Sequence, residues 1–364
     1  MLAPIAWRVP PRHYGPWERV VSLLTEGLVR AGVDVTLFAT ADSLTSARLS
    51  AVVASGYEET PGMDVKVAET LHLANLFDRA GEFDVIHNHA DFLPLSYAGL
   101  VDTPTVTTVH GFSGPRILPI YKRYEHRTSY VAISEADRHP GLRYVATVHH
   151  GIDLGEFTFQ PVAGEYLLFF GRMHPDKGAA DAVRIARAAG RPLLLAGIIQ
   201  DQEYFDREVA PHLNADVQYL GSVGPQERDR LLGGALALLH PIHFDEPFGL
   251  SMVEAMACGT PVIASPRGSV PEVVGADVGA DGSCAGGGYI VNDEAEAVLA
   301  VERATHFDRR AARARVEARF TVERMVAEYL EVYERVRSAR GQSRGRPAPT
   351  PQPHAPEGDV TPLT

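Results

Sequence analysis

Two glutamates with a fixed spacing are the first residues of this chain that could do chemistry. Glu246 precedes a predicted helix over residues 249–258, and Glu254 lies inside it, with seven residues between the two. The start of a helix presents free N–H groups and a positive dipole end, which attract a phosphate, and Gly249 lets the phosphate approach closely. Carboxylates accept hydrogen bonds from vicinal hydroxyls, so a sugar and a ribose are suitable ligands on the two sides of such a phosphate. Taken singly, each glutamate is equally well explained without a ligand, Glu246 as an acid favoured by the helix dipole and Glu254 as a solvated helix residue.

Two cations form a second candidate group. Arg172 and Lys177 lie in the pattern Gly-Arg-x4-Lys-Gly, directly after a predicted strand over residues 166–170. A guanidinium offers a planar fork of donors and an ammonium offers a movable point charge, so the pair suits a diphosphate. In isolation such a pair is more often solvated surface.

Three histidines stand at the ends of predicted strands. His87 and His89 close a strand over residues 83–89, and His110 follows a strand over residues 104–109. Open α/β sheets bind their ligands at the carboxyl ends of strands, so this is where a site is expected. His87 and His89 share one face of their strand, but no third ligand accompanies them, so we expect no metal site.

The elements that must position these residues alternate between strands and helices. Residues 2–6 form a short first strand, a helix begins at Pro16 and ends at Gly32, and residues 34–40 form the next strand. Strand, helix and strand at this spacing make right-handed βαβ units and therefore a parallel sheet. A second series of strands is predicted over residues 166–170, 192–196, 217–221, 235–242 and 261–265. This second series indicates another parallel sheet.

The stretch around the two glutamates resembles the signature of a known family. E-P-F-G-L-x-x-x-E-A-M-A-x-G-x-P-V-I-A-S is similar to the signature of the GT4-type retaining glycosyltransferases, also called glycosyl transferases group 1, and further matching segments follow in family order over residues 4–333. The resemblance implies a GT-B fold, in which two Rossmann-like parallel-sheet domains face a cleft, and a nucleotide-sugar donor. It also implies a C-terminal helix that crosses back to the first domain.

The resemblance assigns roles to single residues. It places His110 beside the transferred sugar and the acceptor, Glu246 on the sugar hydroxyls and Glu254 on the ribose. Arg172 and Lys177 complete the catalytic set by holding the diphosphate. The substrate-binding residues expected besides Glu254 are Gly15, Ser222, Val223, Phe248, Gly249 and Leu250. Where the family usually has Gly-Gly-x-Glu, this chain has Gly15-Pro16-Trp17-Glu18, and Pro16 has no N–H to donate.

The same reading divides the chain into four parts. Residues 1–155 are expected to form an acceptor-binding domain, 156–317 a domain that binds the nucleotide sugar, 318–340 the returning helix, and 341–364 a disordered tail with six prolines. The Gly-rich run 275–288 is longer than the family's usual turn and is expected to be a flexible loop. The arginines between residues 309 and 319 are expected to form a solvated helix face rather than a membrane-docking face.

Composition restricts the partners and the compartment. The chain has 364 residues, 45% hydrophobic residues and a net charge of −12, which suits two cores and argues against nucleic acid or an anionic membrane as a general partner. Two cysteines are too few for a disulfide framework, and no apolar run has the length of a membrane span, so we expect a cytoplasmic protein with at most peripheral membrane contact.

The expected activity is transfer of a hexosyl group from a UDP- or GDP-sugar to an acceptor hydroxyl. No Asp-x-Asp pair occurs in the chain, so the cations are expected to replace a metal, and no cofactor is expected. A saccharide or a small glycoside is favoured over a lipid as acceptor. A sugar-nucleotide epimerase on the same fold and a non-catalytic nucleotide-sugar binder remain as alternatives. A Rossmann-type dehydrogenase is excluded because no G-x-G-x-x-G follows a strand.

Overall fold

The computed structural model describes residues 1–111, 114, 116–275 and 286–344, with side chains as far as residue 339. Most of the Gly-rich run 275–288 and residues 345–364 of the expected tail lie outside the described residues. Residues 341–344 of that tail belong to a helix, because α12 runs from Val322 to Arg344 and not only to residue 340.

The first domain is built on parallel strands. They are β1 (Thr36–Phe38), β2 (Arg48–Ser50), β3 (Ile86–Asn88), β4 (Thr105–Val109), β5 (Thr128–Ala132) and β6 (Tyr144–Thr147). The strand expected over residues 2–6 is reduced to one bridging residue, Leu2, which pairs in parallel with both Phe38 and Asn88. Leu2 thereby joins the pair β1-β2 to the sheet β3-β4-β5-β6. The helices of this domain are α1 (Pro16–Arg30), α2 (Val65–Phe77), α3 (Leu95–Ala98) and α4 (Leu118–Tyr124).

The second domain carries a six-stranded parallel sheet in the order β12-β11-β10-β7-β8-β9. The strands are β7 (Leu167–Phe170), β8 (Leu193–Ala196), β9 (Val217–Tyr219), β10 (Ala237–His240), β11 (Val262–Ala264) and β12 (Gly288–Ile290). The helices are α5 (Ala179–Ala188), α6 (Gln202–Tyr204), α7 (Pro225–Gly234), α8 (Leu250–Ala257), α9 (Val270–Val274), α10 (Glu294–Ala304) and α11 (Arg309–Arg319).

This sheet is buried on both faces. Leu168 and Leu238 point into the core beneath α8, α9 and α11, whereas their neighbours Leu167 and Leu239 point into the core beneath α5 and α10. Because successive side chains of a strand point to opposite faces, a sheet covered by helices on both sides needs apolar residues at every position. That explains why these strands read as continuous apolar runs.

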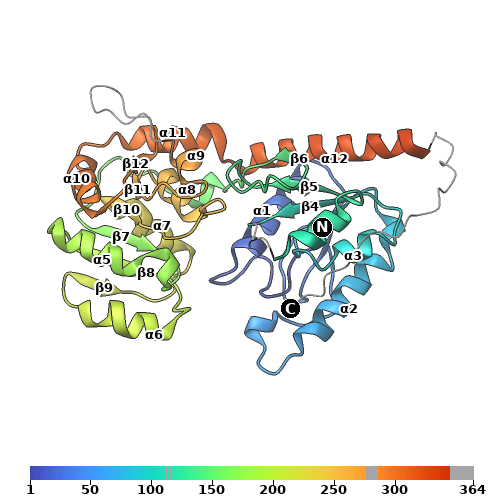
Figure 1. Ribbon diagram of the computed structural model, residues 1–364, viewed down its shortest axis with the longest axis horizontal. Helices are drawn as coiled ribbons and strands as arrows, with labels where there is room; N and C mark the ends of the chain where they lie inside the picture. The colour runs from blue at the N-terminus through green and yellow to red at the C-terminus, as the bar shows by residue number, and fades with distance from the viewer. Residues whose placement is uncertain (112–113, 115, 276–285, 345–364) are drawn as a thin grey trace.

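The last helix, α12, leaves the second domain and crosses along the first, as Figure 1 shows. The crossing starts where Thr321 forms a parallel bridge with Ile152. Met325 and Tyr329 then pack with Leu24 of α1 in one core, and the Tyr329 hydroxyl lies 2.7 Å from Thr108 Oγ1. The helix is therefore part of the core of the first domain, and the expected return of the C-terminal helix is confirmed.

The arginine-rich segment does not form the solvated face that its composition suggested. Arg309 is only 4% exposed and donates hydrogen bonds to the carbonyls of Gln160, Gly233 and Ala235. The guanidinium of Arg313 donates to Phe157 and Ala257, and that of Arg315 to Glu272 and Val273. The prediction was wrong for these three residues because backbone carbonyls left unpaired at loops and helix ends need buried donors.

No helix in the described part of the chain is both long enough and apolar enough to cross a membrane.

We expect a chain shortened to end at residue 344 to keep its melting temperature. The residues removed are rich in proline and poor in large apolar side chains, so they have little surface to bury. Thermal unfolding followed by circular dichroism on both chains checks this. A large drop in the shortened chain would show that the removed residues dock on the body.

Candidate active site

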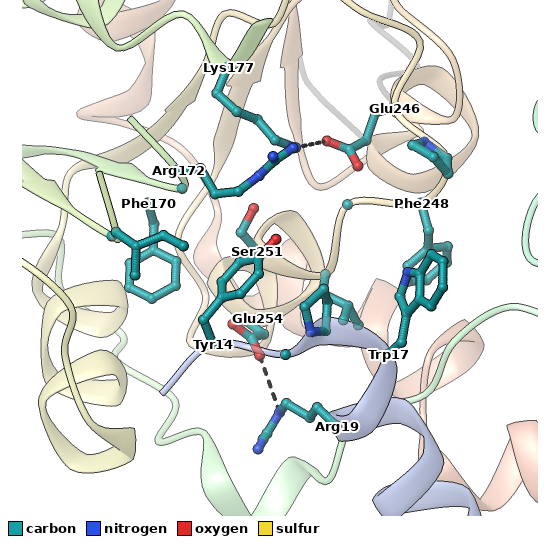
Figure 2. Close-up of a pocket in the computed structure, with 18 of the residues that line it drawn as sticks. Tyr14, Trp17, Arg19, Phe170, Arg172, Lys177, Glu246, Phe248, Ser251 and Glu254 are labelled. Carbon is teal, nitrogen blue, oxygen red and sulfur yellow. Dashed lines mark hydrogen bonds and ion pairs between the residues drawn. The ribbon is translucent and has the colours of Figure 1, made fainter. Parts of the chain in front are cut away.

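A cavity of about 360 Å³ lies between the two domains and is lined by residues of both. The structure brings all the site residues expected from the sequence to its wall. They are Gly15, His110, Arg172, Lys177, Ser222, Val223, Glu246, Phe248, Gly249, Leu250 and Glu254. Figure 2 shows the cations and Glu246 on the side of the second domain, and Tyr14, Trp17 and Arg19 entering from the first.

Helix α8 directs its N-terminus at this cavity. Gly249 is its N-cap with φ of 82°, a left-handed conformation that favours glycine, and a Cβ at this position would lie 2.2 Å from the Met252 side chain. The helix ends at Ala257, followed by Cys258 as C-cap and by Gly259 with φ of 87°. A glycine in the left-handed conformation commonly follows the C-terminus of a helix. At the other end, Gly249, Leu250 and Ser251 line the cavity, so the N-terminal turn of α8 with its unpaired N–H groups faces it.

Glu246 is held by a cation and lies beside a histidine. Lys177 Nζ donates to Glu246 Oε2 at 2.6 Å, and His240 Nε2 lies 3.4 Å from the same oxygen. Burial disfavours the charged form of Glu246, but the neighbouring imidazole and the positive charge of Lys177 outweigh it and lower the pKa to about 2. Burial also lowers the pKa of His240. Glu246 is therefore a carboxylate and Lys177 is oriented.

The cations approach the cavity from the loop that follows β7. Lys177 Nζ lies 4.4 Å from the centre of the Phe244 ring, and the Arg172 guanidinium donates to Gln200. Together with the N-terminus of α8, these groups concentrate positive charge on one side of the cavity. A cavity wall with this concentration of positive charge can bind a diphosphate.

Glu254 is paired with two arginines that the sequence did not single out. Its Oε1 lies 3.1 Å from Arg228 Nη1 and 3.8 Å from Arg19 Nε. Both arginines also reach Glu156, in the segment that joins the domains. Arg19 belongs to α1 and Glu254 to α8, so this network connects the two domains at the cavity (Figure 2).

His110 forms the opposite side of the cavity, on the first domain. Its Nε2 lies 2.7 Å from His89 Nδ1, and its ring stacks on Trp17 with centroids 5.2 Å apart. Burial and the neighbouring His89 and His150 lower the pKa of His110 well below its usual value, so the ring is neutral. His110 Nδ1 has no partner among the described residues. The residue itself lines the cavity.

His87 and His89 serve the structure around His110. His87 Nδ1 lies 2.6 Å from the Tyr333 hydroxyl, and its Nε2 lies 2.7 Å from Thr108 Oγ1. Across the described residues, no group of three or more His, Cys, Asp or Glu side chains is arranged to hold a metal ion.

The turn before α1 brings Gly15 to the cavity as well. Pro16 begins the helix, where its missing N–H costs nothing, and the Gly15 carbonyl accepts from the Arg19 N–H at 2.9 Å. Glu18 is buried behind this turn and accepts from the Trp7 N–H at 3.3 Å. Burial raises the pKa of Glu18 to about 7.

Sequence reasoning missed five residues at the cavity. Four of them, Tyr14, Trp17, Arg19 and His240, belong to the wall itself, and the fifth, Arg228, adjoins the wall through its ion pair with Glu254. His240 closes β10, and Trp17 stands in the first turn of α1 directly after the loop expected to bind substrate. A polar residue at a strand end and a large aromatic residue beside a binding loop are signals that could have found these two. Arg228 lies within a helix among other charged residues, and no local signal marks it.

Comparison with known proteins covers both domains. Residues 17–156 match the family described as Glycosyltransferase Family 4, and residues 158–317 match the family described as Glycosyl transferases group 1. The chain is 28% identical to glycogen synthase of Mycobacterium tuberculosis, over 74% of this chain and 79% of that protein. It is 27% identical to the phosphatidyl-myo-inositol mannosyltransferase of Mycolicibacterium smegmatis, over 73% of this chain and 75% of that one.

A solved structure shows the same architecture. Anabaena HepE in complex with UDP-glucose superposes with a TM-score of 0.68 at 18% identity, covering 92% of this chain and 98% of that chain. With its two parallel-sheet domains and returning C-terminal helix, the chain has the GT-B fold, and it belongs to the GT4-type glycosyltransferases of group 1.

Proposed function

We propose that the protein transfers a hexosyl group from a UDP- or GDP-sugar to an acceptor hydroxyl, with retention of the anomeric configuration and without a metal. The observation that carries this proposal is the ion pair between Lys177 and Glu246, 2.6 Å long, beside Arg172 and the N-terminus of α8. A diphosphate would bind there to the two cations and the helix N-terminus, and a polyhydroxylated ring would hydrogen-bond to the adjacent Glu246. The complex of HepE with UDP-glucose supports a donor of this class.

The chemistry begins with cleavage of the bond between the anomeric carbon and the phosphate oxygen. Arg172, Lys177 and the α8 N–H groups stabilise the negative charge that grows on the departing diphosphate. Glu246 is ionised and accepts hydrogen bonds from the sugar hydroxyls next to the carbon that becomes positive. The acceptor hydroxyl attacks the same face, and its proton passes to the leaving phosphate oxygen. No side chain is needed as general base.

The remaining residues hold the two ends of the donor and the acceptor. Glu254 would accept from the ribose hydroxyls through the oxygen that faces away from Arg228, and Ser222 and Val223 would contact the base. His110, neutral and backed by His89, would hydrogen-bond the transferred sugar next to the acceptor. The acceptor would be a saccharide or a small glycoside, and the relative named glycogen synthase supports this class.

A panel of labelled UDP- and GDP-sugars tests the proposal. Incubation with the protein and a mixture of candidate acceptors should release nucleoside diphosphate and yield a glycoside of unchanged anomeric configuration, measured by NMR. Formation of an epimeric sugar nucleotide would identify an epimerase. Binding of the donor with no product under any condition would identify a non-catalytic binder.

Activity is expected to survive an excess of EDTA. Two side-chain cations and a helix N-terminus already neutralise the leaving group, so a divalent ion adds nothing to the step. The measurement is donor turnover with EDTA and after addition of Mg²⁺ or Mn²⁺. Turnover that disappears with the chelator and returns with either ion would contradict the proposal that cations replace a metal.

A further inference from the structure

A second cavity, of about 330 Å³, lies in the first domain and has Trp17 in its wall. Its wall consists of residues from the segment after Leu2, from α1 and α2, from the loop after β3, and of Tyr57. They are Pro4, Ile5, Trp17, Tyr57, Glu69, His72, Leu73, Ala90, Asp91, Phe92 and Leu93. Trp17 is the one described residue that lines both cavities. The volume of the second cavity falls within the range of small-molecule sites, roughly 300–1,000 Å³.

The charge of this second cavity is negative and uncompensated. Glu69 and Asp91 line it, and no lysine or arginine stands among the described residues of its wall. Burial raises the pKa of Glu69, and the charge of Asp91 raises it further. Burial lowers the pKa of His72 to about 4, so this ring adds no positive charge. The pKa of Tyr57 is raised by burial and then by the carboxylates of Glu69, Glu58 and Glu18.

Two acceptor groups of the wall have no hydrogen-bond partner among the described residues, and a third is held in place by one. The Glu69 carboxylate makes no hydrogen bond with another described residue. His72 is 2% exposed, and its Nε2 is bonded to the Ala3 carbonyl at 2.9 Å, so Nε2 carries the proton. His72 Nδ1 is therefore an acceptor, and within the described part of the chain it is buried without a partner. Asp91 accepts from the Tyr121 hydroxyl through Oδ1 at 2.7 Å, which fixes the orientation of its carboxylate.

Aromatic rings complete the wall. Trp17, Tyr57 and Phe92 contribute flat apolar surfaces beside these acceptors. A pyranose ring presents C–H groups on its faces and hydroxyl donors around its edge, so it matches a wall of rings and acceptors. A phosphate or a carboxylate brought into the same space would face two carboxylates without a cation, and such a like-charge contact is unfavourable.

We propose that the second cavity binds a saccharide unit of the acceptor and selects acceptors that carry no phosphate or carboxylate on that unit. This inference rests on the proposed function, because it assigns to the acceptor a place next to the donor cavity. Trp17 lines both cavities and stacks on His110, so a saccharide in the second cavity would contact the same ring that packs on His110 in the donor cavity. An amino sugar fits at least as well as a neutral sugar, since a protonated amine would be attracted by both carboxylates.

Saturation-transfer NMR with four related probes tests the selection. The probes are methyl β-glucoside, glucosamine, glucose 6-phosphate and glucuronate, each added to the full chain with and without saturating nucleoside diphosphate. The neutral and amino probes should bind, and the two anionic probes should bind more weakly by at least about tenfold, as like-charge repulsion in a desolvated site requires. In the variant Glu69→Lys the order of affinities should reverse, so that glucose 6-phosphate binds more tightly than methyl β-glucoside.

Two further variants keep the test decisive. Glu302→Lys makes the same change of charge at an exposed position of α10 in the other domain, and it should leave the order of the probes unchanged. Glu69→Gln replaces the lysine variant in the test if that variant does not fold. It should reduce the difference in affinity between the neutral and the anionic probes. Equal binding of glucose 6-phosphate and methyl glucoside to the unchanged protein, or binding of no neutral probe, would overturn the proposal. So would an unchanged order in both Glu69 variants.

The proposed function is tested separately, by a second measurement on the same samples. Calorimetry of the nucleoside diphosphate reports on the first cavity, which shares only Trp17 with the second among the described residues. Absence of nucleotide binding would contradict the proposed function, whereas a wrong order of the probes would contradict only the acceptor selection.

Discussion

Replacing Glu246 with glutamine is expected to lower kcat by a factor of roughly 100–1,000, with little change in KM for the donor, as for other groups that act mainly on transition-state charge. The substitution keeps the size of the side chain and one acceptor oxygen, but removes a negative charge beside a carbon that becomes cationic. It also removes the negative charge that pairs with Lys177 at 2.6 Å, so the ammonium of Lys177 is held less tightly and can bind phosphate. Affinity for nucleoside diphosphate should therefore stay constant or increase.

Glu254→Gln is the matched control, because it makes the same chemical change inside α8, the helix that Glu246 precedes. Its contact with the ribose would be equal in ground and transition states, so KM for the donor should rise while kcat changes little. Affinity for the nucleoside diphosphate, which has a ribose and no sugar, should fall by about tenfold, the low end for a hydrogen bond to a charged group. Calorimetry and initial rates measure both. Equal losses of nucleotide affinity in the two variants, or the reverse order, would show that the two carboxylates are wrongly assigned.

Replacing Arg309 with methionine is expected to destabilise the second domain by about 3–5 kcal/mol, since each buried acceptor left without a donor costs roughly 1–3 kcal/mol. The guanidinium donates to three backbone carbonyls at 2.6–3.0 Å and to Thr260 Oγ1 at 2.7 Å. Methionine fills much of the volume but donates nothing. The melting temperature should fall by on the order of 10 °C.

The neighbouring Arg310 supplies the control for this experiment. It stands on the same helix and is exposed, so Arg310→Met should change the free energy of unfolding by no more than about 0.5 kcal/mol, as is usual for surface positions. Urea unfolding of both variants and of the unchanged protein measures the difference. If the two variants unfold alike, Arg309 does not act as a buried donor.

The parts of the site that could be predicted from the sequence are those defined by local rules. Gly249 and Gly259 bracket a short apolar helix, and the backbone conformations they adopt are ones that glycine favours. Arg172 and Lys177 lie one turn after a strand, where a parallel sheet presents its ligands. Because such features depend on neighbours in the chain, one sequence is enough to find them.

The parts that could not be predicted depend on distant contacts. Arg228 pairs with Glu254, which is 26 positions away in sequence, and Arg19 pairs with the same glutamate from 235 positions away. The residues next to either arginine do not indicate this partner. Arg309 was misread for the same reason, since the carbonyls that it satisfies belong to residues 160, 233 and 235. The strand β2 (Arg48–Ser50) is exposed and has no apolar run, so its pattern carried no signal.

The position of α12 has a consequence for the order in which the protein is made. Val322, Met325 and Tyr329 belong to the same core as Val20 and Leu24 of α1, so the first domain is finished by residues translated some three hundred positions later. Until they leave the ribosome, the apolar face of α1 is without its cover, and the second domain is synthesised in the meantime. The newly made first domain is thus a natural client for chaperones, and residues 1–155 expressed alone lack the helix that closes their core.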